Sequence, residues 1–210
     1  MTEPGTSKWR WRIAGLILGI AAVWGVYVKA RPADEVVLTI GEPYKQVRQQ
    51  SRSTLPVLTG DNRINLHIQR PAVLRFSDPQ YGFSTPAAKF LSLYADDSGK
   101  VVAVTLSPQL DTLPLDEAMA VFIGLQDQFR RGGWKPFRVN RNPPIEDTRD
   151  TRAQIRRCVA PTSYWQAGNT YQISLNIRCF RSDDRPNDER YLITLDLGLP
   201  VFGELPNDQE

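Results

Sequence analysis

An uninterrupted apolar stretch near the N-terminus constrains this chain most strongly. Residues 13–28 carry no charged side chain, and basic residues lie on both sides of them. At about 1.5 Å per residue, the stretch and its long basic flanks just reach across a bilayer core of roughly 30 Å. We therefore expect a short cytoplasmic tail over residues 1–12 and one transmembrane helix, a signal anchor, over residues 13–29.

The residues at the two ends of this segment predict its orientation. Three basic residues precede the segment and two follow it, and the more positive flank usually stays in the cytoplasm. We expect a single-pass inner-membrane protein with its N-terminus in the cytoplasm and its C-terminal domain in the periplasm or outside. A GxxxG pattern could pair two such helices into a homodimer. The expected anchor residues, which include aromatic rings suited to the headgroup layer, are Trp11, Gly15, Gly19, Trp24 and Tyr27.

A cleaved signal peptide is the alternative interpretation of the same stretch. Val28-Lys29-Ala30 could precede a small-residue cleavage site. The aromatic and basic residues at the far end of the stretch favour a retained anchor. Both interpretations export the rest of the chain.

Positive charge is concentrated around the apolar stretch. Five of the 26 basic residues but only one of the 23 acidic residues fall in the first 31 positions. The remaining chain has 21 basic and 22 acidic residues and a net charge of −1. The pI of about 8.9 therefore reflects membrane topology, and we expect no nucleic-acid partner.

Two cysteines test this topology independently. Cys158 and Cys179 are the only cysteines, and a pair of cysteines in an exported domain predicts a disulfide. Residues 171–179 alternate between apolar and polar side chains, which indicates a half-buried strand ending at the second cysteine.

A hairpin turn would bring the two cysteines together. Gly168-Asn169 is a two-residue turn signal, so that Ala167 would face Thr170. Continuing this ladder places the cysteines opposite each other at a non-hydrogen-bonded site, with Cα atoms about 4.5 Å apart. Pro161 fits such a ladder only at a bulge or at an edge.

The rest of the exported part predicts one helix and several strands. Apolar residues recur at helical spacing over residues 114–131, with acids in the first turn, arginines in the last turn and a Gly-Gly stop. This stripe is expected to pack on a sheet. The expected strands span residues 36–40, 64–68, 73–76, 90–94, 101–106, 171–179 and 191–197.

These elements predict an α+β fold. We expect a small antiparallel β-sheet domain with one main amphipathic helix packed on it, preceded by the single N-terminal transmembrane helix. Residues 30–60 are expected to be a connector with a possible first strand, polar over 45–54, and residues 61–210 the exported domain. Residues 141–157 are expected to form a charged loop.

Recognisable catalytic motifs are missing from the sequence. His67 is the only histidine, and no GxSxG elbow, Walker loop, dinucleotide fingerprint or HExxH motif is present. We expect no catalytic residue, no metal site and no cofactor, and we expect that the protein is not an enzyme. The acidic residues near 146–150 and 183–189 keep a carboxylate-dependent envelope hydrolase as an alternative, although interleaved arginines favour solvated loops.

Binding to another protein is the favoured interpretation. Between residues 128 and 157, nine basic residues stand against three acidic ones, and a long charged loop is typical of a binding element. The partner-binding candidates are Arg141, Ile145, Glu146, Asp147, Arg149, Arg152, Arg156 and Trp165. We expect an inhibitor or immunity-type protein that neutralises a toxin at the cell envelope. A scaffold subunit of an envelope secretion or division machine is the alternative within the protein-binding class, and a module binding lipid or cell-wall polymer is a further one.

Overall fold

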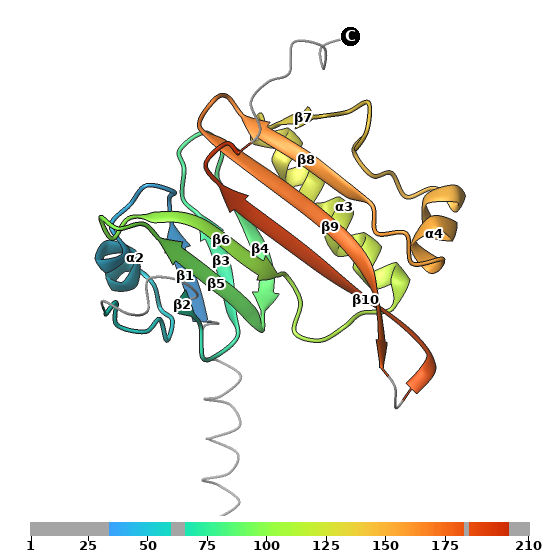
Figure 1. Ribbon diagram of the computed structural model, residues 1–210, viewed down its shortest axis with the longest axis horizontal. Coiled ribbons are helices and arrows are strands. Elements are labelled where there is room, and N and C mark those ends of the chain that lie inside the picture. Colours follow the sequence, from blue (N-terminus) through green and yellow to red (C-terminus); the bar gives the residue numbers. More distant parts are fainter. Residues whose placement is uncertain (1–33, 60–65, 183–184, 202–210) are drawn as a thin grey trace, which may run out of the picture. The chain divides into compact units, whose positions relative to one another are not determined.

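A computed structural model describes residues 34–59, 66–182 and 185–201. Within these ranges the chain is an α+β domain built from two sheets and three helices (Figure 1). No helix in these ranges is long and apolar enough to cross a membrane. The expected transmembrane helix and its anchor residues lie outside the described residues.

The larger sheet has seven strands in the order β2-β5-β6-β10-β9-β8-β7, and every neighbouring pair is antiparallel. This confirms the antiparallel α+β class. The strands are β2 (Leu66–His67), β5 (Phe90–Ala95), β6 (Val101–Ser107), β7 (Lys135–Phe137), β8 (Thr162–Ala167), β9 (Tyr171–Ser182) and β10 (Arg185–Gly198).

A second sheet of three strands departs from the expected single sheet. It comprises β1 (Asp34–Leu38), β3 (Ala72–Phe76) and β4 (Phe83–Ala88). β3 is the central strand, parallel to β1 and antiparallel to β4. A parallel pair needs a long crossover, and the 33 residues between β1 and β3 provide one. β4 escaped prediction because Pro86 interrupts its pattern.

The main helix, α3 (Leu115–Arg131), confirms the predicted amphipathic helix almost residue for residue. Pro114 precedes it, acidic residues occupy its first turn and Gly132 ends it. It packs against β9, β10 and β4. Its buried face consists of Leu115, Ala118, Met119, Phe122, Leu125, Gln126 and Phe129.

One core joins the helix to both sheets. Phe83 of β4 packs edge-on against Phe129 of α3, with ring centroids 5.0 Å apart. Phe76 of β3 meets Tyr171 of β9 in a second edge-on contact at 5.1 Å. Edge-to-face pairs of this kind add to the free energy gained by burial. The second sheet and α3 therefore cover one face of the seven-stranded sheet.

Two short helices replace segments that were expected to lack regular structure. α2 (Tyr44–Gln50) lies within the expected polar connector, and Tyr44 and Val47 are buried in the common core. The compact unit consequently begins at Asp34. α4 (Arg149–Arg156) lies within the expected charged loop and buries only Ile155. With so few apolar residues, neither helix has the periodicity that sequence patterns detect.

The hairpin of β8 and β9 has a different register from the expected one. Ala167 pairs with Tyr171, so three residues rather than two form the turn. This register places Trp165 opposite Ile173 on the buried face, whereas the predicted register would have paired Trp165 with a polar residue. A shift by one residue exchanges the two faces of a strand, so burial of Trp165 and Ile173 decides the register.

The predicted disulfide is present, although its setting differs. Cys158 and Cys179 are bonded, with Cα atoms 5.2 Å apart. Cys158 follows α4 and has a positive φ of 60°. It lies outside the β8–β9 ladder, because that ladder begins at Thr162. Cys179 faces the interior from β9, and the bond therefore fastens α4 to the sheet.

Loss of this disulfide should destabilise the domain without unfolding it. Closing a loop of 21 residues removes enough chain entropy from the unfolded state to contribute about 3 kcal/mol. We expect the Cys158→Ser, Cys179→Ser double variant to lose about this much unfolding free energy in urea titrations. Hydrogen exchange should accelerate most in residues 149–157. An unchanged urea midpoint would contradict a structural role for the bond.

Candidate functional site

Residues 141–161 form one continuous surface segment, which we call the 141–161 element. It begins as an irregular turn, contains α4 and ends where β8 starts. Thr148 caps α4, since its side-chain oxygen accepts a hydrogen bond from the backbone N–H of Thr151 at 3.1 Å. The element holds all the predicted partner-binding residues except Trp165.

A glutamine of α3 holds the first half of the element. Gln126 is fully buried, and its side-chain amide donates to the carbonyl of Ile145 at 2.7 Å and accepts from the N–H of Ile145 at 3.0 Å. The Ile145 side chain is itself buried in the core. The predicted candidate Ile145 is therefore an anchor for the element rather than an exposed contact.

The second half is held by strand β9 from both of its faces. Cys179 bonds Cys158 on the buried face. On the opposite face the side-chain amide of Asn176 donates to the carbonyl of Pro161 at 3.2 Å and to the hydroxyl of Thr162 at 2.8 Å. The element thus presents its charges from a fixed backbone.

Arg152 ties α4 to its surroundings through two carboxylates. Its guanidinium contacts Asp116 at the start of α3 and donates to Asp147 at 2.9 Å. Hydrogen bonding to Arg152 holds the pKa of the Asp147 carboxyl below its ordinary value, against a smaller opposing effect of desolvation. Both groups are therefore charged near neutral pH, and the pair fixes α4 rather than offering a free acid or base.

The other predicted candidates divide between surface and core. Arg141, Glu146 and Arg149 are exposed. Arg156 is also exposed and lies 3.7 Å from Glu189 of β10. Trp165 is fully buried, with its ring 5.7 Å from that of Phe129 and beneath the guanidinium of Arg130.

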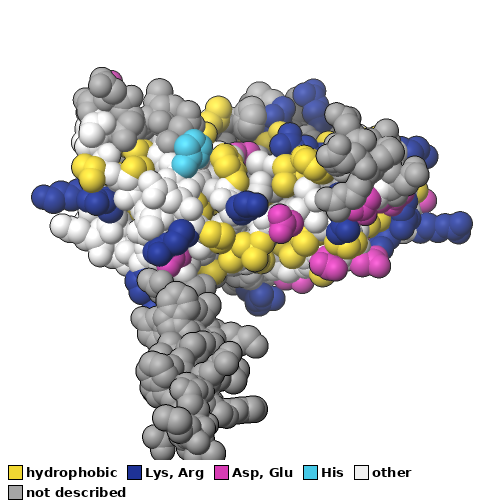
Figure 2. Space-filling view, turned by 90° about the horizontal axis from the view of Figure 1, so that it is seen from below, with side chains coloured by type: hydrophobic (Ala, Val, Ile, Leu, Met, Phe, Trp, Pro, Cys, Tyr) yellow, Lys and Arg dark blue, Asp and Glu magenta, His cyan; other side chains and the backbone are white. Residues whose placement is uncertain are grey.

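Part of the positive charge expected between residues 128 and 157 is engaged within the domain. Several of the nine basic residues between 128 and 157 contact carboxylates or aromatic rings, as Arg130, Arg138 and Arg152 do. On the face drawn in Figure 2, basic side chains lie dispersed among acidic and hydrophobic ones.

The exposed part of the element contains a shallow hollow of about 610 Å³. Its apolar lining includes Pro143, Pro144 and Val159, and Val159 is half exposed. Arg141 and Glu146 also line it. A lining that combines apolar and charged residues suits contact with a protein surface.

A second candidate surface lies on the seven-stranded sheet. The face opposite α3, which we call the open face, is turned toward the viewer in Figure 1. No helix covers it within residues 34–59, 66–182 and 185–201. The strand registers align one residue from each strand into a row across this face, about 29 Å long at 4.8 Å per strand. In strand order, this cross-strand row consists of His67, Ser92, Thr105, Asp196, Ser174, Tyr164 and Phe137.

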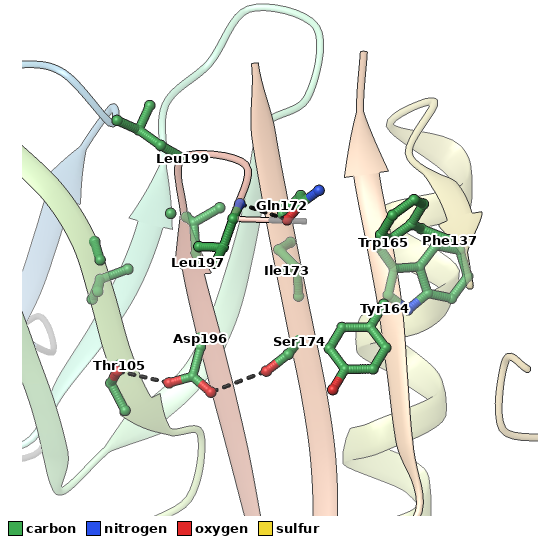
Figure 3. A pocket seen from close by; sticks show the side chains of 14 residues that line it. Thr105, Phe137, Tyr164, Trp165, Gln172, Ile173, Ser174, Asp196, Leu197 and Leu199 are labelled. Atoms are coloured by element: carbon green, nitrogen blue, oxygen red, sulfur yellow. Dashed lines mark hydrogen bonds between the residues drawn. The ribbon is translucent and has the colours of Figure 1, made fainter. Parts of the chain in front are cut away.

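Asp196 stands at the centre of the row between two hydroxyl groups. Thr105 donates to its Oδ1 at 2.7 Å and Ser174 donates to its Oδ2 at 3.0 Å, as Figure 3 shows. A hollow of about 310 Å³ lies beside it. Its lining is mainly apolar and includes Phe137 and Leu199. We call this the Asp196 hollow.

The only histidine does not complete a catalytic triad with these groups. His67 is exposed and neighbours Ser92 across the ladder, but the Ser92 hydroxyl is buried and has no hydrogen-bond partner. Asp196 lies three strands from His67, or about 14 Å. In a catalytic triad the nucleophile, the base and the acid are joined by hydrogen bonds. Here the Ser92 hydroxyl has no hydrogen bond to His67, and Asp196 is too far from His67 to form one. Among the described residues, no cluster of His, Cys, Asp or Glu could hold a metal ion.

The sequence hypothesis missed the cross-strand row. Residues such as Asp196 and Ser174 occupy the polar positions of correctly predicted strands, so the alternation already placed them away from the core. Their lateral alignment depends on the registers of several ladders, which the alternation alone does not determine.

No family model, no curated protein and no solved structure matches the chain.

Two glutamines of α3 allow a test of how the 141–161 element is held. Gln126→Ala leaves the buried N–H and carbonyl of Ile145 without partners, and we expect a loss of about 2–4 kcal/mol of unfolding free energy. Gln128 bonds the backbone of Ser84 in the same two-bond manner, but at the surface. Gln128→Ala should therefore cost less than about 1 kcal/mol, because water replaces the lost bonds.

Urea unfolding and hydrogen exchange at the Ile145 amide measure both effects. Exchange at Ile145 should accelerate in Gln126→Ala and stay unchanged in Gln128→Ala. Equal losses of stability in the two variants would mean that the buried pair does not anchor the element.

Proposed function

We propose that this protein is anchored in the inner membrane and uses its exported domain to bind another protein. The class that we favour is an inhibitor or immunity-type protein that neutralises a toxin at the envelope. The observation that carries the proposal is the anchoring of the charged 141–161 element by a disulfide, a buried glutamine and Asn176.

Fixing this element before binding has a thermodynamic benefit. Ordering a flexible loop on association costs free energy, and a loop that is already ordered avoids that cost. The element is rich in charge, and charges around an interface guide the choice of partner and speed association. Its predicted candidates Arg141, Glu146 and Arg149 are exposed and available for such contacts.

The disulfide also supports export of the domain. Disulfides persist in oxidising compartments such as the periplasm and are rare in the cytosol. This agrees with the topology expected from the basic and apolar residues at the N-terminus. The anchor would hold the domain near the membrane that it protects.

The alternative of a carboxylate-dependent hydrolase has less support. Asp147 is paired with Arg152, and its lowered pKa suits a permanent carboxylate rather than a general acid. The second acidic loop includes Asp183 and Asp184, which lie outside the described residues. A scaffold role in a secretion or division machine remains the nearest alternative, because it too needs only protein binding.

Topology can be measured directly. A reporter that is active only outside the cytoplasm, fused after Glu210, should be active. Thiol labelling in intact cells should find Cys158 and Cys179 blocked until a reductant is added. Active reporter with freely reactive thiols would contradict the proposed role of the disulfide, and an inactive reporter would contradict export.

An immunity role predicts a phenotype that depends on neighbouring cells. We expect a strain lacking this chain to grow normally alone but to lose viability when mixed with its parent, which still delivers the toxin. The full chain should restore survival. A triple variant with Arg141→Glu, Glu146→Lys and Arg149→Glu should restore it poorly.

The control variant reverses charges of the same kind away from the element, at Lys45, Asp97 and Lys100, and should restore survival fully. A growth defect in pure culture would favour the scaffold. Normal survival of the deletion strain in the mixture would contradict immunity.

A further inference from the structure

We propose that the Asp196 hollow is a recognition pocket for an arginine side chain carried by a partner protein. The inference rests on the proposed protein-binding function for the source of the arginine. The pocket lies on a different surface from the 141–161 element, and the contact would be between its carboxylate and a guanidinium.

The orientation of the carboxylate favours a guanidinium. Asp196 accepts one hydrogen bond on each oxygen, from Thr105 on the β6 side and from Ser174 on the β9 side. A carboxylate has about four acceptor positions, so one on each oxygen remains. Two parallel acceptors of this kind match the two-pronged N–H face of an arginine and are less well used by the compact ammonium of lysine.

The charge of Asp196 is not neutralised by an ion pair within the described part of the chain. Among residues 34–59, 66–182 and 185–201, no lysine or arginine forms an ion pair with it. Arg138 contacts one residue of the lining, since its guanidinium lies 5.8 Å from the centre of the Tyr164 ring. Tyr164 is two strands from Asp196, so roughly 10 Å separates the two regions.

The walls suit the aliphatic part of an arginine. Figure 3 shows Asp196 and Ser174 toward one end of the hollow and the half-exposed Leu199 toward the other. The volume of about 310 Å³ is at the small end for ligand sites and accommodates a long side chain rather than a large cofactor. Arginine buries its methylene stem on apolar surface while its head remains polar.

Protein-observed NMR on the full chain in zwitterionic detergent micelles tests this inference without the natural partner. The probe is N-acetyl-arginine methylamide, compared with the corresponding lysine and citrulline compounds. We expect saturable shifts at the amides of Thr105, Ser174 and Asp196 with the arginine probe. Lysine should bind several-fold more weakly, and the uncharged citrulline should give no saturable shift.

Two substitutions localise the effect. Asp196→Asn should weaken arginine binding about tenfold, which is the effect of losing one charge-assisted contact. Asp111→Asn is the matched control, because Asp111 is an exposed carboxylate that lines a neighbouring hollow on the open face. It should bind the probe like the unmodified chain. Folding of both variants is checked by their dispersed amide spectra.

Three results would overturn the pocket: no arginine response, equal responses to arginine and citrulline, or an unaltered response in Asp196→Asn. Equal binding of lysine and arginine would overturn the guanidinium preference. These measurements are separate from the mixed-culture test. Failure here with successful protection would remove this pocket and leave the protein-binding function in place.

Discussion

The packing of α3 against the odd-numbered residues of β9 is the interaction on which the rest of the structure depends. Tyr171, Ile173, Leu175 and Ile177 are all buried, and α3 supplies the apolar stripe beneath the sheet. Because side chains alternate along a strand, burial of the odd-numbered residues places every even-numbered residue of β9 on the open face. The same constraint sets the registers of β8 and β10, where a shift by one residue would expose Trp165 or Leu195.

Both candidate surfaces follow from that constraint. With the odd-numbered residues inside, Ser174 and Asn176 must lie on the open face. Ser174 joins the cross-strand row beside Asp196, and Asn176 holds the end of the 141–161 element. Cys179, on the buried side, holds the same element through the disulfide. A single strand therefore positions the charges of one surface and the carboxylate of the other.

Sequence patterns predicted the parts of the fold whose signals are local and strong. The α3 helix has a long apolar period with matching charges at its ends, and the strands of the β5–β6 hairpin flank a turn with Gly99 at a positive φ of 77°. The disulfide was predicted from cysteine number and expected compartment. The predicted hairpin register that accompanied it was wrong, because Gly168 enters a three-residue turn and burial of Trp165 outweighs the two-residue turn signal.

Elements stabilised mainly by tertiary contacts escaped prediction. α4 buries only Ile155, and what fixes it is a cap, Arg152 and a covalent bond to a strand distant in sequence. The candidate site shows the same limit. Ile145 stands in a charged region of the sequence yet anchors the core, as Trp165 does, whereas Asp196 looks like an ordinary polar position of a strand. Its environment arises only when the β6–β10 and β10–β9 ladders align, so the chemistry of the open face is a property of the assembled sheet rather than of any one segment.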